Sequence, residues 1–335
     1  MITPAEVLAG LLVGCALVYS FLNGLHDGAN TVATMITSRA LPPRSALWMV
    51  GLAEFSGPFV FGVAVARTIG ADVVAPQAVT LTATIAALVS ASLWNVVTWR
   101  LGIPSSSSHA LIGGLLGSAV ASSGFQFGVL NRGGLTKVGV GLFLAPPLSL
   151  VAAYLVMQVT QFVLRGATPR VNWFFKRGQV LTTLALALSH GANDAPKSMG
   201  IIVMGLVSAG FLAGFYVPGW VAAAAAGAVA LGTMLGGWQL IRTLGARFYR
   251  VRPIHAFTSQ ITSGALVLIA SLVGSPVSTS QVVSSAIAGV GAAQRFSKVR
   301  WRVMREIAIA WVLTIPATAA AGGIVYLLLS QWLGH

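Results

Sequence analysis

Long stretches of this chain without a single Asp, Glu, Lys or Arg residue limit its fold more than any other feature. A helix needs about 20 mainly apolar residues to cross a bilayer, so each stretch holds one span or two. With 56% hydrophobic and 8% charged residues, the chain could not build a water-exposed surface. The sequence therefore predicts an all-helical polytopic membrane protein. The charge-free stretches are 7–26, 73–99, 138–164, 198–241, 253–294 and 307–335.

The first apolar run has no basic residue before it, so we expect it to be a permanent span rather than a cleaved signal peptide. The single cysteine, Cys15, excludes an intramolecular disulfide and a cysteine-based metal site. We interpret it as a small packed residue.

The formal net charge of +14 comes from basic residues that lie between apolar segments. In this position they follow the positive-inside rule and indicate topology, not a nucleic-acid partner. Placing the clusters in the cytoplasm predicts that both termini lie outside. Four clusters hold 15 of the 20 Lys and Arg residues: Arg39 and Arg44; Arg165, Arg170, Lys176 and Arg177; Arg242, Arg247, Arg250 and Arg252; Arg295, Lys298, Arg300, Arg302 and Arg305.

Two blocks of sequence occur twice in the same order. Residues 26–30 (HDGAN) match 193–197 (NDAPK) at an offset of 167, and residues 104–109 (PSSSSH) match 276–281 (PVSTSQ) at an offset of 172. We interpret this as a duplication. The first copy makes an odd number of crossings, so the two halves have opposite orientations. The predicted organisation is a first repeat at 1–164, a cytoplasmic linker at 165–177 and a second repeat at 178–335.

Three acids, Asp27, Asp194 and Glu54, fall inside apolar sequence. A carboxylate at membrane depth costs several kcal/mol and therefore indicates a functional site. Gly28 follows the first acid and Pro196 follows the second by two residues, and both residue types weaken helices. We therefore expect broken helices at both acids. Glu54 is equally well explained as a cation ligand or as a structural acid.

The two Ser/Thr blocks resemble capped helix N-termini, where free N–H groups, the helix dipole and hydroxyl groups attract anions. The first block is followed by an apolar segment near Ala110, and the second by one near Val282. The predicted crossings include a hairpin before Arg132 and a span with a returning segment within 253–294. The candidate anion ligands are Ser105, Ser106, Ser107, Ser108, Ser278, Thr279 and Ser280.

Carboxylates beside an anion site would repel the anion unless a cation neutralises them. We therefore expect Asp27 and Asp194 to hold a coupling cation, with Lys197 adding positive charge. A carboxylate could also accept a hydrogen bond from a protonated oxyanion, which favours phosphate over sulfate. His26, His109 and His190 flank the motifs; each could carry a proton, although a structural hydrogen bond is the simpler interpretation.

At these residues the chain resembles the PiT family of inorganic phosphate transporters. The matching stretches, in order, are 23–34 (NGLHDGANTVAT), 104–109 (PSSSSH), 189–197 (SHGANDAPK) and 276–281 (PVSTSQ). The sequences around Asp27 and His109 are most similar to the low-affinity bacterial branch, whose members resemble proton-coupled carriers of phosphate or metal-phosphate. The chain has Gln281 where many relatives have His, and it lacks an acid near Gln260.

The resemblance implies an inverted-repeat helical bundle with broken helices and re-entrant hairpins, in a bacterial-type plasma membrane. It implies that phosphate is bound by Asp27, Asn30, Asp194, Lys197 and the Ser/Thr blocks. The coupling cation, H+ or Na+, would be held by Asp27, Asn30, Asn193, Asp194 and Glu54. No cofactor and no metal beyond Na+ is expected, and assembly into a homo-oligomer stays open.

Two alternatives differ in chemistry. A sulfate permease of the same fold would be distinguished by competition between phosphate and sulfate. An intramembrane serine hydrolase would use Ser108, His109 and Asp27, but a nucleophile next to its own histidine in the chain is poor triad geometry. The second Ser block also lacks a following histidine.

Overall fold

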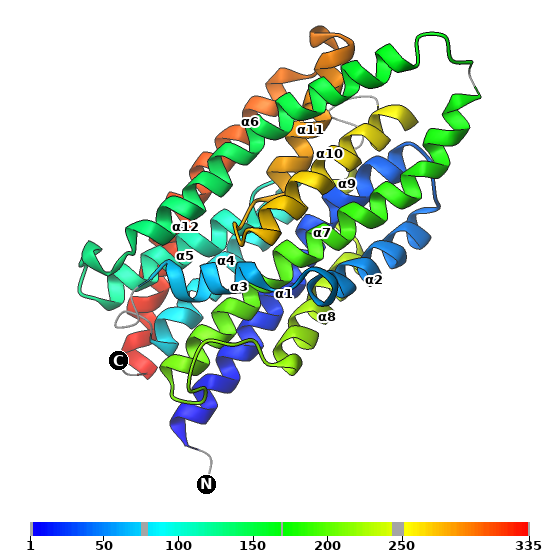
Figure 1. The fold of residues 1–335 in the computed structure, drawn as a ribbon. Helices are drawn as coiled ribbons and strands as arrows, with labels where there is room; N and C mark the ends of the chain where they lie inside the picture. The colour runs from blue at the N-terminus through cyan, green and yellow to red at the C-terminus, as the bar shows by residue number, and fades with distance from the viewer. Residues whose placement is uncertain (1–2, 75–79, 169, 243–250, 334–335) are drawn as a thin grey trace.

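The protein is an elongated bundle of helices (Figure 1). The computed structural model describes residues 3–74, 80–168, 170–242 and 251–333, and every named element in those ranges is helical. Arg247 and Arg250 of the third basic cluster lie outside the described residues. The long helices are α1 Pro4–Thr37, α2 Pro43–Phe61, α4 Leu81–Leu101, α5 Ser107–Ser122, α6 Arg132–Val163, α7 Val171–Ser208, α8 Gly219–Leu235, α10 Pro253–Leu272, α11 Thr279–Gln294 and α12 Trp301–Leu333. Shorter elements are α3 Ala64–Arg67, η1 Thr68–Asp72, η3 Phe127–Val129, α9 Trp238–Arg242 and η5 Phe296–Lys298.

The order of elements in residues 4–163 recurs in residues 171–333. Each half begins with a long helix, α1 or α7, and ends with another, α6 or α12. The second helix of each half ends at a glycine with positive φ, Gly62 at 84° and Gly236 at 75°. A helical hairpin follows, α4–α5 or α10–α11.

Helices of one half pack mainly on helices of the other. α1 packs on α8 and α2 on α7, while α5 packs on α12 and α6 on α11. Glycines make the first two contacts close. A Cβ atom added at Gly24 would lie 2.0 Å from the Val229 carbonyl oxygen, and one at Gly191 would lie 2.0 Å from the Glu54 carbonyl oxygen. The two halves therefore share one interlocked core.

The prediction of broken helices at the two acids is wrong. α1 runs without interruption through Asp27, and α7 runs through Asp194 and Pro196. The glycines near the acids do not end a helix, because they are needed where another helix crosses closely. The break lies in the second helix of the half instead: α2 and the α3–η1 segment meet at 78°, next to Gly62.

Among the described residues, five helices are long and apolar enough to cross a membrane, α1, α4, α6, α10 and α12, or six spans if α2 with α3–η1 counts as one. This supports a multi-pass membrane protein. α7 has 38 residues but is not among the five. It carries the exposed Lys176 and Arg177 near its start and the buried His190, Asp194 and Lys197 in the core, and these polar residues lower its mean hydropathy.

The turns of both hairpins lead from the surface into the protein. Gly102 ends α4 in the left-handed conformation with φ 65°, and Gly274 follows α10 with φ 69°. The segments that follow are buried from Pro104 and Pro276 into the first turns of α5 and α11. The Ser/Thr blocks of the two halves are therefore brought into the core as the starts of two helices.

Candidate functional site: a buried polar core between the two halves

The two aspartates are buried and contact neighbouring residues of one helix. Asp27 is 1% exposed and Asp194 is 0% exposed. Ser280 Oγ donates to Asp27 Oδ1 at 2.7 Å, and Thr279 Oγ1 donates to Asp194 Oδ2 at 3.4 Å. The first turn of α11 therefore joins two acids that are 167 positions apart in the chain, one from each half.

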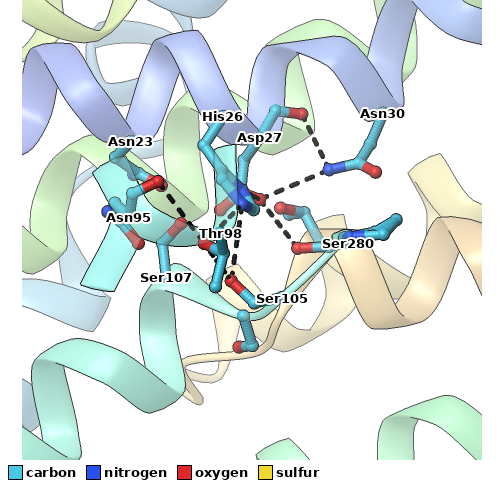
Figure 2. Close-up of polar contacts among 12 residues, drawn as sticks. Asn23, His26, Asp27, Asn30, Asn95, Thr98, Ser105, Ser107 and Ser280 are labelled. Carbon is cyan, nitrogen blue, oxygen red and sulfur yellow. Dashed lines mark hydrogen bonds and ion pairs between the residues drawn. The ribbon is translucent and has the colours of Figure 1, made fainter. Parts of the chain in front are cut away.

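Asp27 is surrounded by one imidazole and neutral donors (Figure 2). His26 Nδ1 lies 3.1 Å from Asp27 Oδ1, and Asn30 Nδ2 donates to the same oxygen at 3.3 Å. The other ring nitrogen of His26 lies 3.3 Å from Thr98 Oγ1 and 3.4 Å from Ser105 Oγ. Through His26, Asp27 on α1 is thus connected to the hairpin α4–α5.

Asp194 is surrounded by charged groups. Lys197 Nζ donates to Asp194 Oδ1 at 2.5 Å, and His190 Nε2 lies 2.7 Å from Asp194 Oδ2. His190 Nδ1 lies 2.6 Å from Glu54 Oε1, so one imidazole joins two carboxylates. Thr233 Oγ1 of α8 donates to the second Glu54 oxygen at 2.5 Å. Glu54 is therefore part of the core, and it contacts Asp194 through His190.

Lys197 and Asn193 attach α7 to the hairpin turns. The Lys197 ammonium also donates to Ser108 Oγ at 2.6 Å and to the Val277 carbonyl at 2.9 Å. Asn193 Nδ2 donates to Ser271 Oγ at 3.1 Å, while Asn193 Oδ1 accepts from the Val277 amide at 3.3 Å. In this conformation Asn193 therefore holds the turn before α11.

The N-termini of α5 and α11 meet in the core. Ser106 Oγ accepts from the His109 amide at 3.1 Å and caps α5; Ser278 Oγ accepts from the Gln281 amide at 3.4 Å and caps α11. Gln281 Nε2 and His109 Nδ1, which occupy equivalent positions in the two blocks, lie 3.1 Å apart. The geometry brings together two helix starts whose dipoles favour an anion.

Several buried polar atoms near the acids have no hydrogen-bond partner among the residues that the structure describes. They include Ser107 Oγ, Asn30 Oδ1, Asn23 Oδ1 and both side-chain polar atoms of Asn95. Figure 2 shows these four residues around Asp27. Buried polar groups are almost always satisfied, so a set of unpaired donors and acceptors in one place is typical of a site that receives a small polar ligand.

All the residues that the sequence analysis proposed as ligands are buried, at 2% exposure or less. Sequence reasoning missed Asn23, whose Nδ2 donates to Asp194 Oδ2 at 3.4 Å. The offset of 167 aligns Asn23 with His190 and could have identified it. Thr98 and Thr233 had no comparable signal, because isolated threonines in apolar helices commonly bond only to their own helix.

The geometry does not support a serine hydrolase. Ser108 Oγ contacts Lys197 and the Val277 carbonyl, whereas His109 Nδ1 pairs with Gln281. Asp27 pairs with His26 instead of His109. The described residues also contain no group of three or more His, Cys, Asp and Glu side chains that could hold a metal ion.

A multi-pass helical bundle with charged groups buried between its halves defines a membrane transporter. The chain belongs to the phosphate transporter family, whose pattern matches residues 23–322. Members of this family are transporters and not enzymes.

Curated relatives match almost the whole chain. A probable low-affinity inorganic phosphate transporter of Rhizobium meliloti is 42% identical over 318 residues, covering 94% of both chains. A protein of Bacillus subtilis with the same description is 38% identical over 329 residues, covering 97% of this chain and 98% of its own. A solved structure described as the sodium-dependent phosphate transporter superposes with a TM-score of 0.84, covering 97% of this chain and 100% of its own. Because the two sequences are only 23% identical, this match shows a shared fold and nothing more.

Proposed function

We propose that this protein is a secondary active symporter that imports inorganic phosphate together with a cation. The observation that carries the proposal is the pair of buried aspartates joined by Thr279 and Ser280, beside two helix N-termini that meet in the core. Membership of the phosphate transporter family and the descriptions of the bacterial relatives support phosphate as the substrate.

The anion side of the site consists of the two Ser/Thr blocks. Ser106 and Ser278 are engaged as caps, and the first backbone amides of α5 and α11 would bind phosphate together with hydroxyl groups of the two blocks. Ser107 Oγ is a buried hydroxyl without a partner and is the first candidate ligand. The remaining candidates are Ser105, Ser108, Thr279, Ser280, Asp27, Asn30, Asp194 and Lys197.

The cation side is built on Asp27. Its carboxylate accepts hydrogen bonds from Ser280 Oγ and Asn30 Nδ2, and Asn30 Oδ1 is a buried acceptor without a partner in the described part of the chain. Oxygen atoms of this kind suit Na+, and the carboxylate itself could take up H+. Asp194 and Asn193 of the second half, together with Glu54 of α2, form the corresponding region around the other acid. The sodium dependence named for the structural neighbour is a property of that protein, so both ions are tested.

We further propose that residues 1–164 and 178–335 are inverted repeats joined by a linker at 165–177, and that α4–α5 and α10–α11 are re-entrant hairpins. The recurring order of elements and the hairpin turns that lead into the protein support this organisation. The positive-inside rule assigns the linker to the cytoplasm and both termini to the outside of a bacterial plasma membrane. Fusion of a periplasm-dependent phosphatase to the C-terminus tests that orientation, because activity requires an external terminus.

Uptake of labelled phosphate into proteoliposomes tests the function. We expect accumulation when a Na+ gradient or a pH gradient is imposed, and the gradient that drives it identifies the coupling ion. Excess unlabelled phosphate should abolish the signal, whereas sulfate should not. Adding and omitting Mg2+ tests whether metal-phosphate is the transported species. If neither gradient drives accumulation by the wild-type protein, the proposal is wrong.

A further inference from the structure

The ammonium group of Lys197 is fully engaged with oxygen atoms. It donates to a carboxylate oxygen of Asp194, a hydroxyl oxygen of Ser108 and a carbonyl oxygen of Val277, at 2.5, 2.6 and 2.9 Å. A lysine ammonium has three N–H donors, so none is left for another ligand. The side chain is 1% exposed. Lys197 therefore fills a small oxygen-lined position in the core.

Asp27 is surrounded by the counterparts of two of these three oxygen groups, a carboxylate and a serine hydroxyl, but not by an ammonium. At the offset of 167, Asp194 corresponds to Asp27 and Lys197 to Asn30; at the offset of 172, Ser108 corresponds to Ser280. Ser280 Oγ contacts Asp27 Oδ1, as Ser108 Oγ contacts the lysine that neutralises Asp194. Asn30 reaches the same carboxylate but brings no charge, and its Oδ1 has no partner.

The difference in charge decides which acid needs an external cation. A buried carboxylate without a compensating charge costs several kcal/mol. Asp194 has Lys197 beside it, and His190 lies between Asp194 and Glu54. Asp27 has only His26, which carries a charge only when protonated. Asp194 is therefore compensated by an ammonium of the chain itself, whereas Asp27 is compensated only when His26 is protonated or a cation binds.

We propose that Lys197 permanently occupies the position at which a second coupling cation would otherwise bind, so that transport uses one exchangeable cation fewer than two symmetric half-sites would need. This inference rests on the proposed symport of phosphate. It gives Lys197 a role in setting the cation stoichiometry, which differs from the expectation that it is a direct phosphate ligand.

The test replaces Lys197 with the residue that the other half uses. Lys197→Asn, Lys197→Arg and wild type are reconstituted, and equilibrium phosphate accumulation is measured against imposed Na+ gradients and pH gradients with the membrane potential clamped. The slope of log accumulation against log gradient gives the number of coupled cations. We expect this number to rise by one in Lys197→Asn and to stay unchanged in Lys197→Arg. An unchanged slope in Lys197→Asn would overturn the proposal.

Phosphate binding to the detergent-purified protein provides a measurement that does not need turnover. In Lys197→Asn, phosphate affinity should fall by about tenfold or more in choline buffer and recover as NaCl is added or the pH is lowered. Affinity that stays low at every NaCl concentration and pH would identify Lys197 as a phosphate ligand and contradict the inference. Failure of the wild-type protein to accumulate phosphate would instead contradict the proposed function.

Discussion

The surroundings of Asp27 and Asp194 have the same framework but different charge. Each acid lies on the long first helix of its half, and each contacts the first turn of α11. Around Asp194 there are Lys197 and the His190 bridge to Glu54. Around Asp27 the partners other than His26 are neutral. The comparison teaches that two sites with the same framework of helices can differ in charge and therefore in task.

Removal of each carboxylate should separate those tasks most clearly. Asp27→Asn and Asp194→Asn are both expected to reduce phosphate uptake by about 100-fold or more, because each substitution removes a buried negative charge from the core. Asp194→Asn should also destabilise the fold by about 3–5 kcal/mol, because Lys197 and His190 are left buried near an incomplete partner. Asp27→Asn should change the thermal unfolding midpoint much less.

The control for these variants is Glu306→Gln. Glu306 pairs with Arg302 at an exposed position of α12, where an ion pair contributes about 0–1 kcal/mol. Uptake and the unfolding midpoint should both stay near the wild-type values. Equal destabilisation by Asp27→Asn and Asp194→Asn would remove the proposed difference between the two half-sites.

The packing around the two acids should, in contrast, respond equally in both halves. Gly24→Ala and Gly191→Ala each direct a methyl group at a backbone carbonyl 2.0 Å away, so each should cost about 1–3 kcal/mol. Gly10→Ala, in the same helix as Gly24, has no atom within 4 Å and should leave the unfolding midpoint unchanged or raise it. A large difference between the first two variants would show that the helix crossings are not equivalent.

The equivalent serines should affect cation dependence unequally. Ser280→Ala removes a donor to Asp27, so the cation concentration that gives half-maximal uptake should rise by about tenfold. Ser108→Ala removes an acceptor of Lys197 and should lower the maximal rate without changing that concentration. Uptake measured against Na+ concentration at constant pH, and against pH without Na+, checks both. The same shift in both variants would contradict the assignment of the exchangeable cation to Asp27.

The smallest effect is expected for Thr279→Val. Its hydroxyl is 3.4 Å from Asp194, which marks a weak hydrogen bond, so the loss should stay below about 1 kcal/mol. Initial uptake rates should therefore fall by less than about fivefold. A loss as large as that of Ser280→Ala would indicate that Thr279 contacts phosphate directly.

Much of the site could be predicted because membrane sequences contain few polar residues. A carboxylate such as Asp27 in an apolar run has few structural explanations, and its repetition at Asp194 identified the pair. The contact between Asp27 and Ser280 could also be anticipated from two repeated blocks that occur in the same order. Charge scarcity and repetition therefore defined the members of the core.

The backbone at the acids could not be predicted in the same way. Gly28 predicts a weak point in α1, but a Cβ atom there would meet Thr233 of α8. Gly24 and Gly191 likewise lie where α8 and α2 cross, and these helices are far away in the sequence. The link from His190 to Glu54 depends on the same crossing of α7 and α2. A glycine in the sequence allows either a bend in a helix or a close contact with another helix, and only the fold shows which of the two occurs.

Helices of the first half find their packing partners in the second half, and this has a consequence for synthesis of the chain. While only residues 1–164 have been made, α1 has no α8 to cover it and α2 has no α7. Asn23 likewise has no Asp194, and Glu54 has no His190. During that interval the nascent chain holds polar side chains in the bilayer without their partners, so chaperoning by the insertion machinery should matter most before the second half emerges from the ribosome.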